Sequence, residues 1–266
     1  MPRTSEKYKT DYYFKNEKKT TPVVFIHGVG LTKEIWSQQT EFFKNHSILT
    51  YDLIGHGKTP LEKTQLNFQD FTKQLLNLIN ELEINKIHLV GFSLGALVAR
   101  HFAAEHEDRL NSLILHGSIY KRSNDQKRVV ENRYELIKMD NRSTSKKSSL
   151  RRWFTEEYIK DNKEVYDKIY LMLERNNQKN FLKAYKLFVY YEDDDEMLAK
   201  INTNTLVTTG QHDVGSTTEM AKNLAGQIKN AKYIEIKKGK HLCNIESAED
   251  FNKTIELFID QNYDEA

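Results

Sequence analysis

Five residues, Gly91-Phe92-Ser93-Leu94-Gly95, separate two segments of opposite character. The segment before them, residues 84–90, is short, apolar and rich in β-branched residues, as in a buried strand. The segment after them, residues 96–104, consists largely of small and helix-favouring residues. The sequence therefore predicts a strand, a sharp turn and a helix. The two glycines permit the strained backbone that such a turn imposes on Ser93.

Strand and helix patterns alternate in the same way through both ends of the chain. Continuous apolar runs, typical of strands buried on both faces, occur at residues 23–26 and 48–51, and further strand-like runs occur at residues 112–116, 205–210 and 233–236. A first strand is expected within residues 8–14, and residues 68–82 have the apolar spacing of a helix. This alternation predicts an α/β fold with a mostly parallel, doubly wound sheet of seven or eight strands.

Two helices near the C-terminus are expected to begin at capping boxes. Ser216 is followed three residues later by Glu219, and Ser247 is followed by Asp250. In such a pair the serine accepts a hydrogen bond from the backbone and the acidic side chain bonds back to the serine N–H.

The alternation stops after residue 118 and resumes near residue 201. Residues 119–200 contain only helical patterns, with a polar loop expected at 142–149 and a short helix expected to open at Trp153. The predicted domains are therefore a core of residues 1–118 and 201–266 and a helical insertion of residues 119–200. We expect the insertion to form a lid over a site on the core.

Composition limits the class of protein. The 266 residues suffice for one large domain, and 40 basic against 38 acidic residues leave a net charge of +2, which gives no reason to expect nucleic acid or a membrane surface as partner. The N-terminus lacks the apolar core of a signal peptide, and no run of about 18 apolar residues occurs. The single cysteine excludes an internal disulfide framework. A cytoplasmic protein is expected, and its oligomeric state is left open.

The pattern G-x-S-x-G between a strand and a helix is typical of a nucleophile elbow. A serine hydroxyl needs a base to accept its proton, and a histidine base needs an acid to fix its tautomer. We predict Ser93 as the nucleophile and His241 as the base, because His241 follows the last strand, at the sheet edge where Ser93 is expected. His27 and His56 lie in glycine-flanked loops and are expected to hold loop structure.

The acid is predicted to be Asp213, which lies three residues beyond the end of strand 205–210. Asp52 is a rival, but it follows a strand at a tight loop that it is expected to brace. The acidic run at residues 193–195 is expected to be solvated, and Cys243 is expected to be a small packed thiol.

An oxyanion at the reacting carbonyl needs two donors. One is predicted to be the backbone N–H of Leu94, directly after the nucleophile. The other is predicted to be the N–H of Val29, in the loop that follows strand 23–26.

The chain order Ser93, Asp213, His241 is that of the α/β-hydrolases. The chain resembles the α/β-hydrolase superfamily with a helical lid, over nearly its whole length outside the first dozen residues. Within that superfamily, residues 210–221 (GQHDVGSTTEMA) and 241–246 (HLCNIE) resemble the 3-oxoadipate enol-lactonase and carboxylesterase branch. This resemblance implies hydrolysis of a small-molecule ester or lactone through an acyl-Ser93 intermediate, without a cofactor or metal.

Three other functions stay open. Cofactor-free perhydrolases have the same three residues. Carbon–carbon bond hydrolases also have them, although those enzymes commonly carry Trp where this chain has Leu242. Some proteins of this fold act as ligand receptors or signalling proteins with slow turnover.

The lid is expected to supply the substrate pocket. It carries aromatic residues beside arginines at positions 122, 133, 151 and 152, and an inward-pointing arginine would bind a substrate carboxylate through a bidentate contact. A solvated position is the commoner one for any single arginine. Arg151 and Arg152 are the better candidates, because they precede Trp153 at the start of an amphipathic segment, and all three are predicted to contact substrate.

Overall fold

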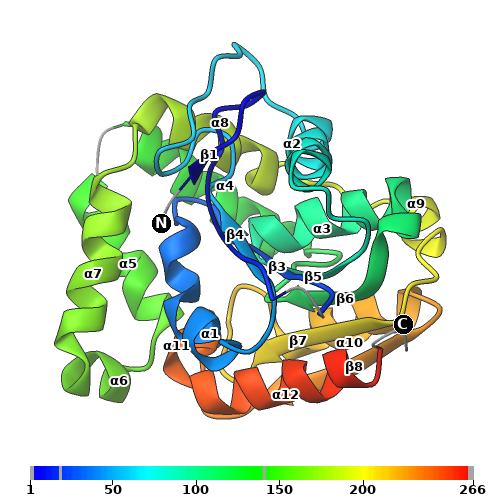
Figure 1. Ribbon diagram of the computed structural model, residues 1–266. Coiled ribbons are helices and arrows are strands. Elements are labelled where there is room, and N and C mark those ends of the chain that lie inside the picture. Colours follow the sequence, from blue (N-terminus) through cyan, green and yellow to red (C-terminus); the bar gives the residue numbers. More distant parts are fainter. Residues whose placement is uncertain (1–2, 18–19, 140–141, 263–266) are drawn as a thin grey trace.

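In the computed structural model, the described residues are 3–17, 20–139 and 142–262. Their strands form one sheet in the order β1-β2-β4-β3-β5-β6-β7-β8 (Figure 1). The strands are β1 (Arg3–Thr4), β2 (Asp11–Lys15), β3 (Val23–Ile26), β4 (Ile48–Tyr51), β5 (Ile87–Phe92), β6 (Leu110–His116), β7 (Thr205–Gly210) and β8 (Ala231–Ile236). Residues 1–2, 18–19 and 263–266 of the predicted core and residues 140–141 of the predicted insertion lie outside the described residues.

The sheet is parallel from β4 to β8, and β2 pairs antiparallel with β4. The strand expected within residues 8–14 is β2, which begins and ends slightly later. Parallel strands end at the same edge, so the loops after β3, β5, β7 and β8 meet there. The strand order reverses between β3 and β5, and the crevice at such a reversal is where ligands bind in doubly wound sheets.

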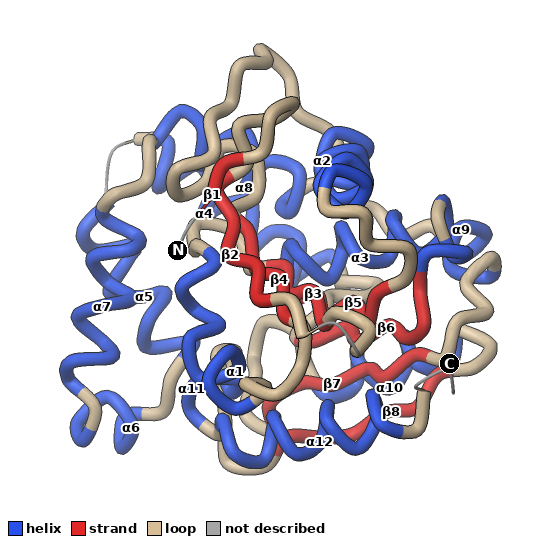
Figure 2. Tube along the Cα trace, viewed as in Figure 1, coloured by secondary structure: helices blue, strands red, loops and turns tan. Residues whose placement is uncertain are grey.

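Helices cover both faces of the sheet, as Figure 2 shows. The helices of the core are α1 (Ser37–Phe42), α2 (Phe68–Glu81), α3 (Leu94–Glu105), α10 (Thr218–Gln227), α11 (Cys243–Glu246) and α12 (Ala248–Asp260), with 3-10 turns at Lys33–Trp36 and Glu107–Arg109. Alternate strand residues serve opposite faces. Val24 and Ile26 join the cluster with α2, α3 and α10, whereas Val23 and Phe25 join the cluster with α1 and α12.

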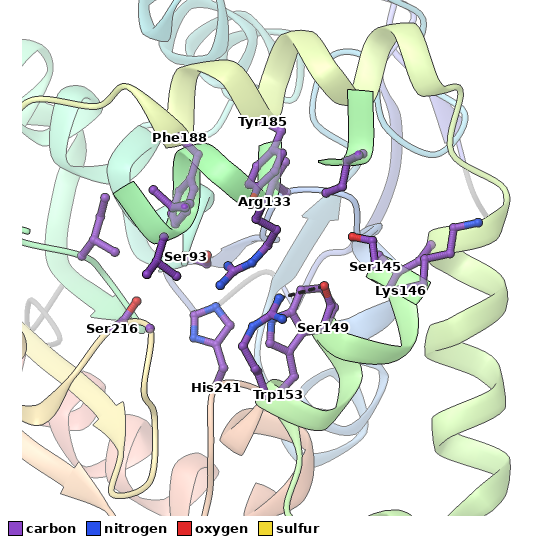
Figure 3. A pocket seen from close by; sticks show the side chains of 18 of the residues that line it. Ser93, Arg133, Ser145, Lys146, Ser149, Trp153, Tyr185, Phe188, Ser216 and His241 are labelled. Carbon is purple, nitrogen blue, oxygen red and sulfur yellow. Dashed lines mark hydrogen bonds between the residues drawn. The ribbon is translucent and has the colours of Figure 1, made fainter. Parts of the chain in front are cut away.

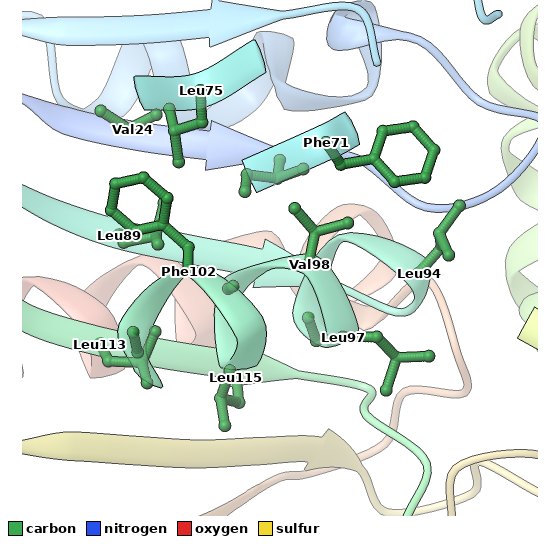
Figure 4. Packing of buried hydrophobic residues seen from close by; sticks show 14 of the residues in the cluster. Val24, Phe71, Leu75, Leu89, Leu94, Leu97, Val98, Phe102, Leu113 and Leu115 are labelled. Atoms are coloured by element: carbon green, nitrogen blue, oxygen red, sulfur yellow. The ribbon is translucent and has the colours of Figure 1, made fainter. Parts of the chain in front are cut away.

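The helix after the elbow is held by buried apolar packing (Figure 4). Leu97 and Phe102 of α3 belong to one fully buried cluster with Leu89 of β5 and Leu113 of β6. Burial of one such side chain contributes about 1.5–3 kcal/mol. The turn before α3 is therefore fixed between a central strand and a firmly packed helix.

Between β6 and β7, the described residues form helices joined by loops and contain no strand. The helices are α4 (Asn124–Lys138), α5 (Arg142–Trp153), α6 (Glu156–Asp161), α7 (Lys163–Glu174), α8 (Gln178–Val189) and α9 (Asp195–Ala199). The polar loop expected at residues 142–149 is wrong, because this stretch belongs to α5, and Trp153 ends that helix instead of opening one. Leu150 and Phe154 are fully buried against residues of α7, so tertiary packing stabilises a helix that its own sequence favours only weakly.

Neither expected capping box forms. The N-cap of α10 is Thr217, because Ser216 is held in the preceding turn, where its N–H donates to Asp213. Ser247 precedes α12, but its hydroxyl donates to the carbonyl of Lys237 rather than capping the helix.

Candidate active site

Ser93 sits in a strained turn between β5 and α3, with φ 54° and ψ −114°. The positions of Gly91 and Gly95 have no room for a side chain. A Cβ at Gly91 would collide with the carbonyl of Gly95, and a Cβ at Gly95 would collide with the carbonyl of Ile26 on β3. The turn therefore packs against the neighbouring strand and holds Ser93 at the end of β5, almost buried at 5% exposure.

His241 and Asp213 are joined by a short hydrogen bond. His241 Nδ1 donates to Asp213 Oδ2 at 2.6 Å, and the second carboxylate oxygen accepts from the N–H groups of Gly215 and Ser216 at 2.8 and 3.0 Å. A carboxylate bonded to Nδ1 fixes the tautomer in which Nε2 accepts a proton. His241 remains accessible from the pocket, whereas the Asp213 side chain is 1% exposed.

Asp213 is held as a carboxylate despite its burial. Burial by itself raises its pKa, but the neighbouring His241 and the hydrogen bonds from His241, Ser216 and Gly215 outweigh that effect and lower the pKa below its usual value. The negative charge that orients His241 is therefore maintained.

The loop after β3 lies directly beside the elbow. A Cβ placed on Gly28 would be 3.2 Å from the Cβ of Ser93, and the next residue, Val29, lines the same pocket as Ser93. Leu94 is the first residue of α3, and the first N–H groups of a helix have no partner within it. The two predicted oxyanion donors, the N–H groups of Val29 and Leu94, thus flank Ser93 on adjacent segments.

A pocket of about 450 Å³ opens above these residues, between the sheet edge and the helical insertion (Figure 3). Ser93, His241 and Asp213 line its floor, and Trp153 lies against His241 with ring centroids 6.3 Å apart. The apolar walls come from the insertion and include Ile119, Val130, Ile137, Leu173, Phe181 and Phe188.

Three of the four arginines singled out in the insertion line this pocket, namely Arg122, Arg133 and Arg152. The expected place of Arg151 at the pocket is wrong. Arg151 is exposed, and its backbone carbonyl accepts from Lys240 Nζ at 3.0 Å. One step along a helix turns the side chain by about 100°, so adjacent arginines of α5 point in different directions.

The sequence analysis named Arg133 among the arginines of the insertion but preferred Arg151 and Arg152 as the residues that face the pocket. A signal was present, because Arg133 lies three residues after Val130 and four before Ile137, and both of these are buried. An arginine on the apolar side of a helix indicates an inward-facing charge.

The other histidines and the other aspartate considered for the base and the acid have structural roles. His27 Nε2 accepts from the N–H of Leu53 at 3.0 Å, and Asp52 accepts from the N–H groups of Lys33 and Lys58. Both therefore brace loops, as expected. His56 is also buried, with its ring 5.1 Å from that of His27.

The acidic run is not simply solvated. The side chain of Asp193 is 9% exposed and pairs with the fully buried Arg100 at 2.7 Å. Cys243 is fully buried, and its Sγ lies 3.6 Å from His116 Nε2. Burial raises the pKa of the Cys243 thiol well above its usual value.

Within the described residues, no group of three or more His, Cys, Asp or Glu side chains is arranged to hold a metal ion. In the same part of the chain, no helix has both the length and the apolar character needed to cross a membrane.

The family model described as "alpha/beta hydrolase fold" matches residues 21–248. The chain belongs to the α/β-hydrolase family. This match confirms the predicted fold and the family resemblance.

The chain is similar to several characterised hydrolases. It is 28% identical over 257 residues to (E)-2-((N-methylformamido)methylene)succinate hydrolase of Acinetobacter baylyi, and the match covers 95% of each chain. It is 22% identical to 3-oxoadipate enol-lactonase 2 of the same organism, over 89% of this chain and 88% of that one. Among solved structures, the enol-lactonase of Burkholderia xenovorans LB400 superposes with a TM-score of 0.85 at 24% identity, covering 94% of this chain and 96% of that one.

Proposed function

We propose that this protein is a serine hydrolase that cleaves a small ester or lactone through an acyl-Ser93 intermediate. The observation that carries the proposal is the 2.6 Å hydrogen bond between His241 and Asp213 at the floor of the pocket that the strained Ser93 also lines. Ser93 is the nucleophile, His241 the base and then the acid, and Asp213 the orienting carboxylate.

The reaction has two halves. Ser93 Oγ attacks the acyl carbon as its proton moves to His241 Nε2, and the resulting oxyanion accepts hydrogen bonds from the N–H groups of Val29 and Leu94. When the intermediate collapses, His241 returns the proton to the departing alcohol oxygen. Water then attacks the acyl-enzyme by the same route, which releases the acid and restores Ser93. With a lactone, acid and alcohol remain in one product.

The helical insertion, residues 119–200, acts as the lid in this proposal, on a core formed by residues 1–118 and 201–266. It supplies most of the pocket wall, including Trp153 next to His241. A wall of this kind excludes water from the acyl group and strengthens the electrostatic interactions within the site.

The names of the similar proteins support a small substrate that carries an acyl group. Their names denote a hydrolase of a substituted succinate and a lactonase of an oxoadipate compound. We take from them the substrate class, a small carboxylic acid derivative, and leave the individual compound to experiment.

The test is a substrate panel of aryl esters, enol-lactones, N-acyl enamines and vinylogous 1,5-diketones, assayed with the wild type, Ser93→Ala and His241→Ala. Each substitution is expected to lower kcat by several orders of magnitude. A fluorophosphonate probe should form its adduct on Ser93. An unchanged rate in Ser93→Ala, or an adduct elsewhere, contradicts the proposal.

The same panel, with acetate and hydrogen peroxide added, separates the alternative functions. Preferential cleavage of the diketone indicates a carbon–carbon bond hydrolase, and peracid formation from acetate and hydrogen peroxide indicates a perhydrolase. A single turnover followed by retained product indicates a receptor.

A further inference from the structure

Two positively charged side chains face the pocket without a carboxylate partner. Arg133 and Arg152 are half-buried and line the cavity, and neither forms an ion pair with any described Asp or Glu. The two acidic side chains at the pocket rim are engaged elsewhere, Asp125 with Arg128 and Glu174 with Lys146. An unpaired, partly desolvated cation is costly, so this part of the pocket favours an incoming anion.

The third arginine of the pocket has a different role. Arg122 donates to the backbone carbonyls of Val189 and Phe188 at 2.8 and 2.7 Å, and its guanidinium lies over the Phe188 ring at 4.6 Å. These carbonyls belong to the C-terminal turn of α8, so Arg122 caps that helix. Its donors are largely used within the protein.

Arg152 and Arg133 keep donors available for a ligand. Arg152 donates to the hydroxyls of Ser148 and Ser149, which are neutral and hold its orientation without cancelling its charge. Arg133 points into the space above Ser93 and His241, as Figure 3 shows.

The charges of the two arginines converge on one place. Burial, together with the smaller effect of the neighbouring charge of Arg133, lowers the pKa of Arg152 to about 10. Tyr185 lines the same pocket, and its side chain lies beside that of Arg133 (Figure 3). Burial raises its pKa, and both guanidinium groups act on it in the opposite direction. Two guanidiniums and a phenol hydroxyl thus face one small volume, and these are the donors that recognise a carboxylate.

We infer that Arg133 and Arg152, with the Tyr185 hydroxyl, bind a free carboxylate carried by the acyl part of the substrate. This inference rests on the proposed function and narrows it, because the enzyme then prefers monoesters and lactones of dicarboxylic acids to neutral esters. The bound carboxylate supplies the missing counter-charge and positions the second carbonyl over Ser93.

The test compares two substrates of nearly the same shape, monoethyl succinate and ethyl 4-oxopentanoate, in which an acetyl group replaces the carboxylate. Ethanol release gives kcat/KM for each, and the ratio of the two values is the carboxylate preference. Arg133→Gln and Arg152→Gln are each expected to lower this ratio at least about tenfold, which corresponds to about 1.4 kcal/mol.

The matched controls are Arg151→Gln, one residue from Arg152 on the exposed side of α5, and Arg128→Gln, exposed on α4. Both should keep the wild-type ratio. Arg133→Lys, which keeps the charge but loses the fork of donors, should give an intermediate ratio. Thermal unfolding of each variant shows whether the fold is intact.

A binding measurement separates this inference from the proposed function. Calorimetric titration of Ser93→Ala with succinate should show binding that Arg133→Gln and Arg152→Gln, each added to Ser93→Ala, weaken at least about tenfold. If succinate binds in this way but no ester is cleaved, the carboxylate site stands and the hydrolase proposal fails. If esters are cleaved through Ser93 with the same ratio in both arginine variants, the carboxylate site is overturned and the hydrolase stands.

Discussion

At the scale of single residues, the glycines of this chain differ in how much space surrounds them. A methyl group at Gly91 would collide with the backbone of α3, whereas a Cβ at Gly226 on α10 would meet nothing within 4 Å. Two chemically identical substitutions should therefore have opposite effects.

Gly91→Ala is expected to destabilise the protein by at least about 2 kcal/mol and to abolish activity, because the turn that carries Ser93 must open. Gly226→Ala is expected to stabilise it by about 0.5–1 kcal/mol, since alanine is the better helix former. Urea unfolding measures both. Equal stability of the two variants would show that the turn has more room than the structure gives it.

Asp213→Asn keeps the shape of the side chain but presents an amide to His241 Nδ1. We expect kcat to fall roughly 10³–10⁴-fold, because the amide N–H favours the tautomer that leaves Nε2 unable to accept a proton. Asp125→Asn, on the exposed rim of the pocket, is the control and should change kcat little. A small loss in Asp213→Asn would mean that His241 is not oriented by this carboxylate.

The candidate catalytic residues could be placed from the sequence because each of them directly follows a predicted strand. Ser93, Asp213 and His241 each follow a parallel strand, and the ends of such strands must converge. Arg133 lies inside a helix of the insertion, where the direction of a side chain depends on how that helix packs. Its place in the pocket was for that reason harder to predict than the places of the residues on the sheet.

At the scale of secondary-structure elements, one buried ion pair joins the insertion to the elbow helix. Arg100 of α3 donates to the carbonyl of Ile119 at 3.0 Å and pairs with Asp193, whose other oxygen accepts from the N–H of Lys121. Both ends of the insertion are thus tied to α3. Nothing in the sequence of the acidic run, residues 193–195, indicated that Arg100 would be its partner.

Asp193→Ala is expected to destabilise the protein by about 3–5 kcal/mol, because it leaves Arg100 charged and buried. The double variant Arg100→Met, Asp193→Leu should recover most of that loss, since neither charge then remains. Asp125→Ala breaks an exposed pair with Arg128 and should cost less than about 1 kcal/mol. Chemical denaturation gives all three values, and a double variant as unstable as Asp193→Ala would rule out charge burial as the cause.

The errors at this scale have a common origin. Residues 142–149 were expected to be a loop because they are polar, yet they form a helix whose anchor, Leu150, lies just beyond them. Serines were expected to cap α10 and α12, yet the N–H of Ser216 donates to Asp213 in the turn before α10, and the hydroxyl of Ser247 donates to the carbonyl of Lys237. The residue types alone predicted neither result, because packing against α7 stabilises α5 and each serine binds a group outside the helix that it was expected to cap.

At the scale of the whole molecule, the fold was predictable because the central strands β3 to β7 are buried on both faces, and such runs leave a clear pattern in the sequence. The same burial encloses several histidines. Burial lowers the pKa of His27 and His101 to about 4 and that of His56 and His116 to about 3. All four are therefore neutral in the folded protein at neutral pH.

Acid should weaken the fold in a defined pH window. The folded pKa values lie below the ordinary value of 6.5, so the stabilising contribution is present above pH 6.5 and is lost as pH falls toward the folded values. Each histidine should add a slope of about 1.4 kcal/mol per pH unit between its two pKa values. Urea unfolding across this window measures the slope.

His101→Phe tests the assignment, because a phenyl ring preserves the stacking on Phe68, where the ring centroids are 4.6 Å apart, and removes one titrating group. The slope should decrease by the contribution of one proton. His212→Gln, at an exposed position, should leave it unchanged. A slope in His101→Phe equal to that of the wild type would show that this histidine is not protonated on unfolding.

The lone thiol of this chain has a practical consequence. Because Cys243 is sealed in the core, a maleimide dye will find no reactive sulfur on the native surface. Cysteines introduced at Val129 on α4 and Leu257 on α12, both exposed, would then be the sole attachment points for a donor and an acceptor fluorophore. The transfer efficiency between the two dyes would report, molecule by molecule, the distance between α4 of the insertion and α12 of the core, with and without a ligand.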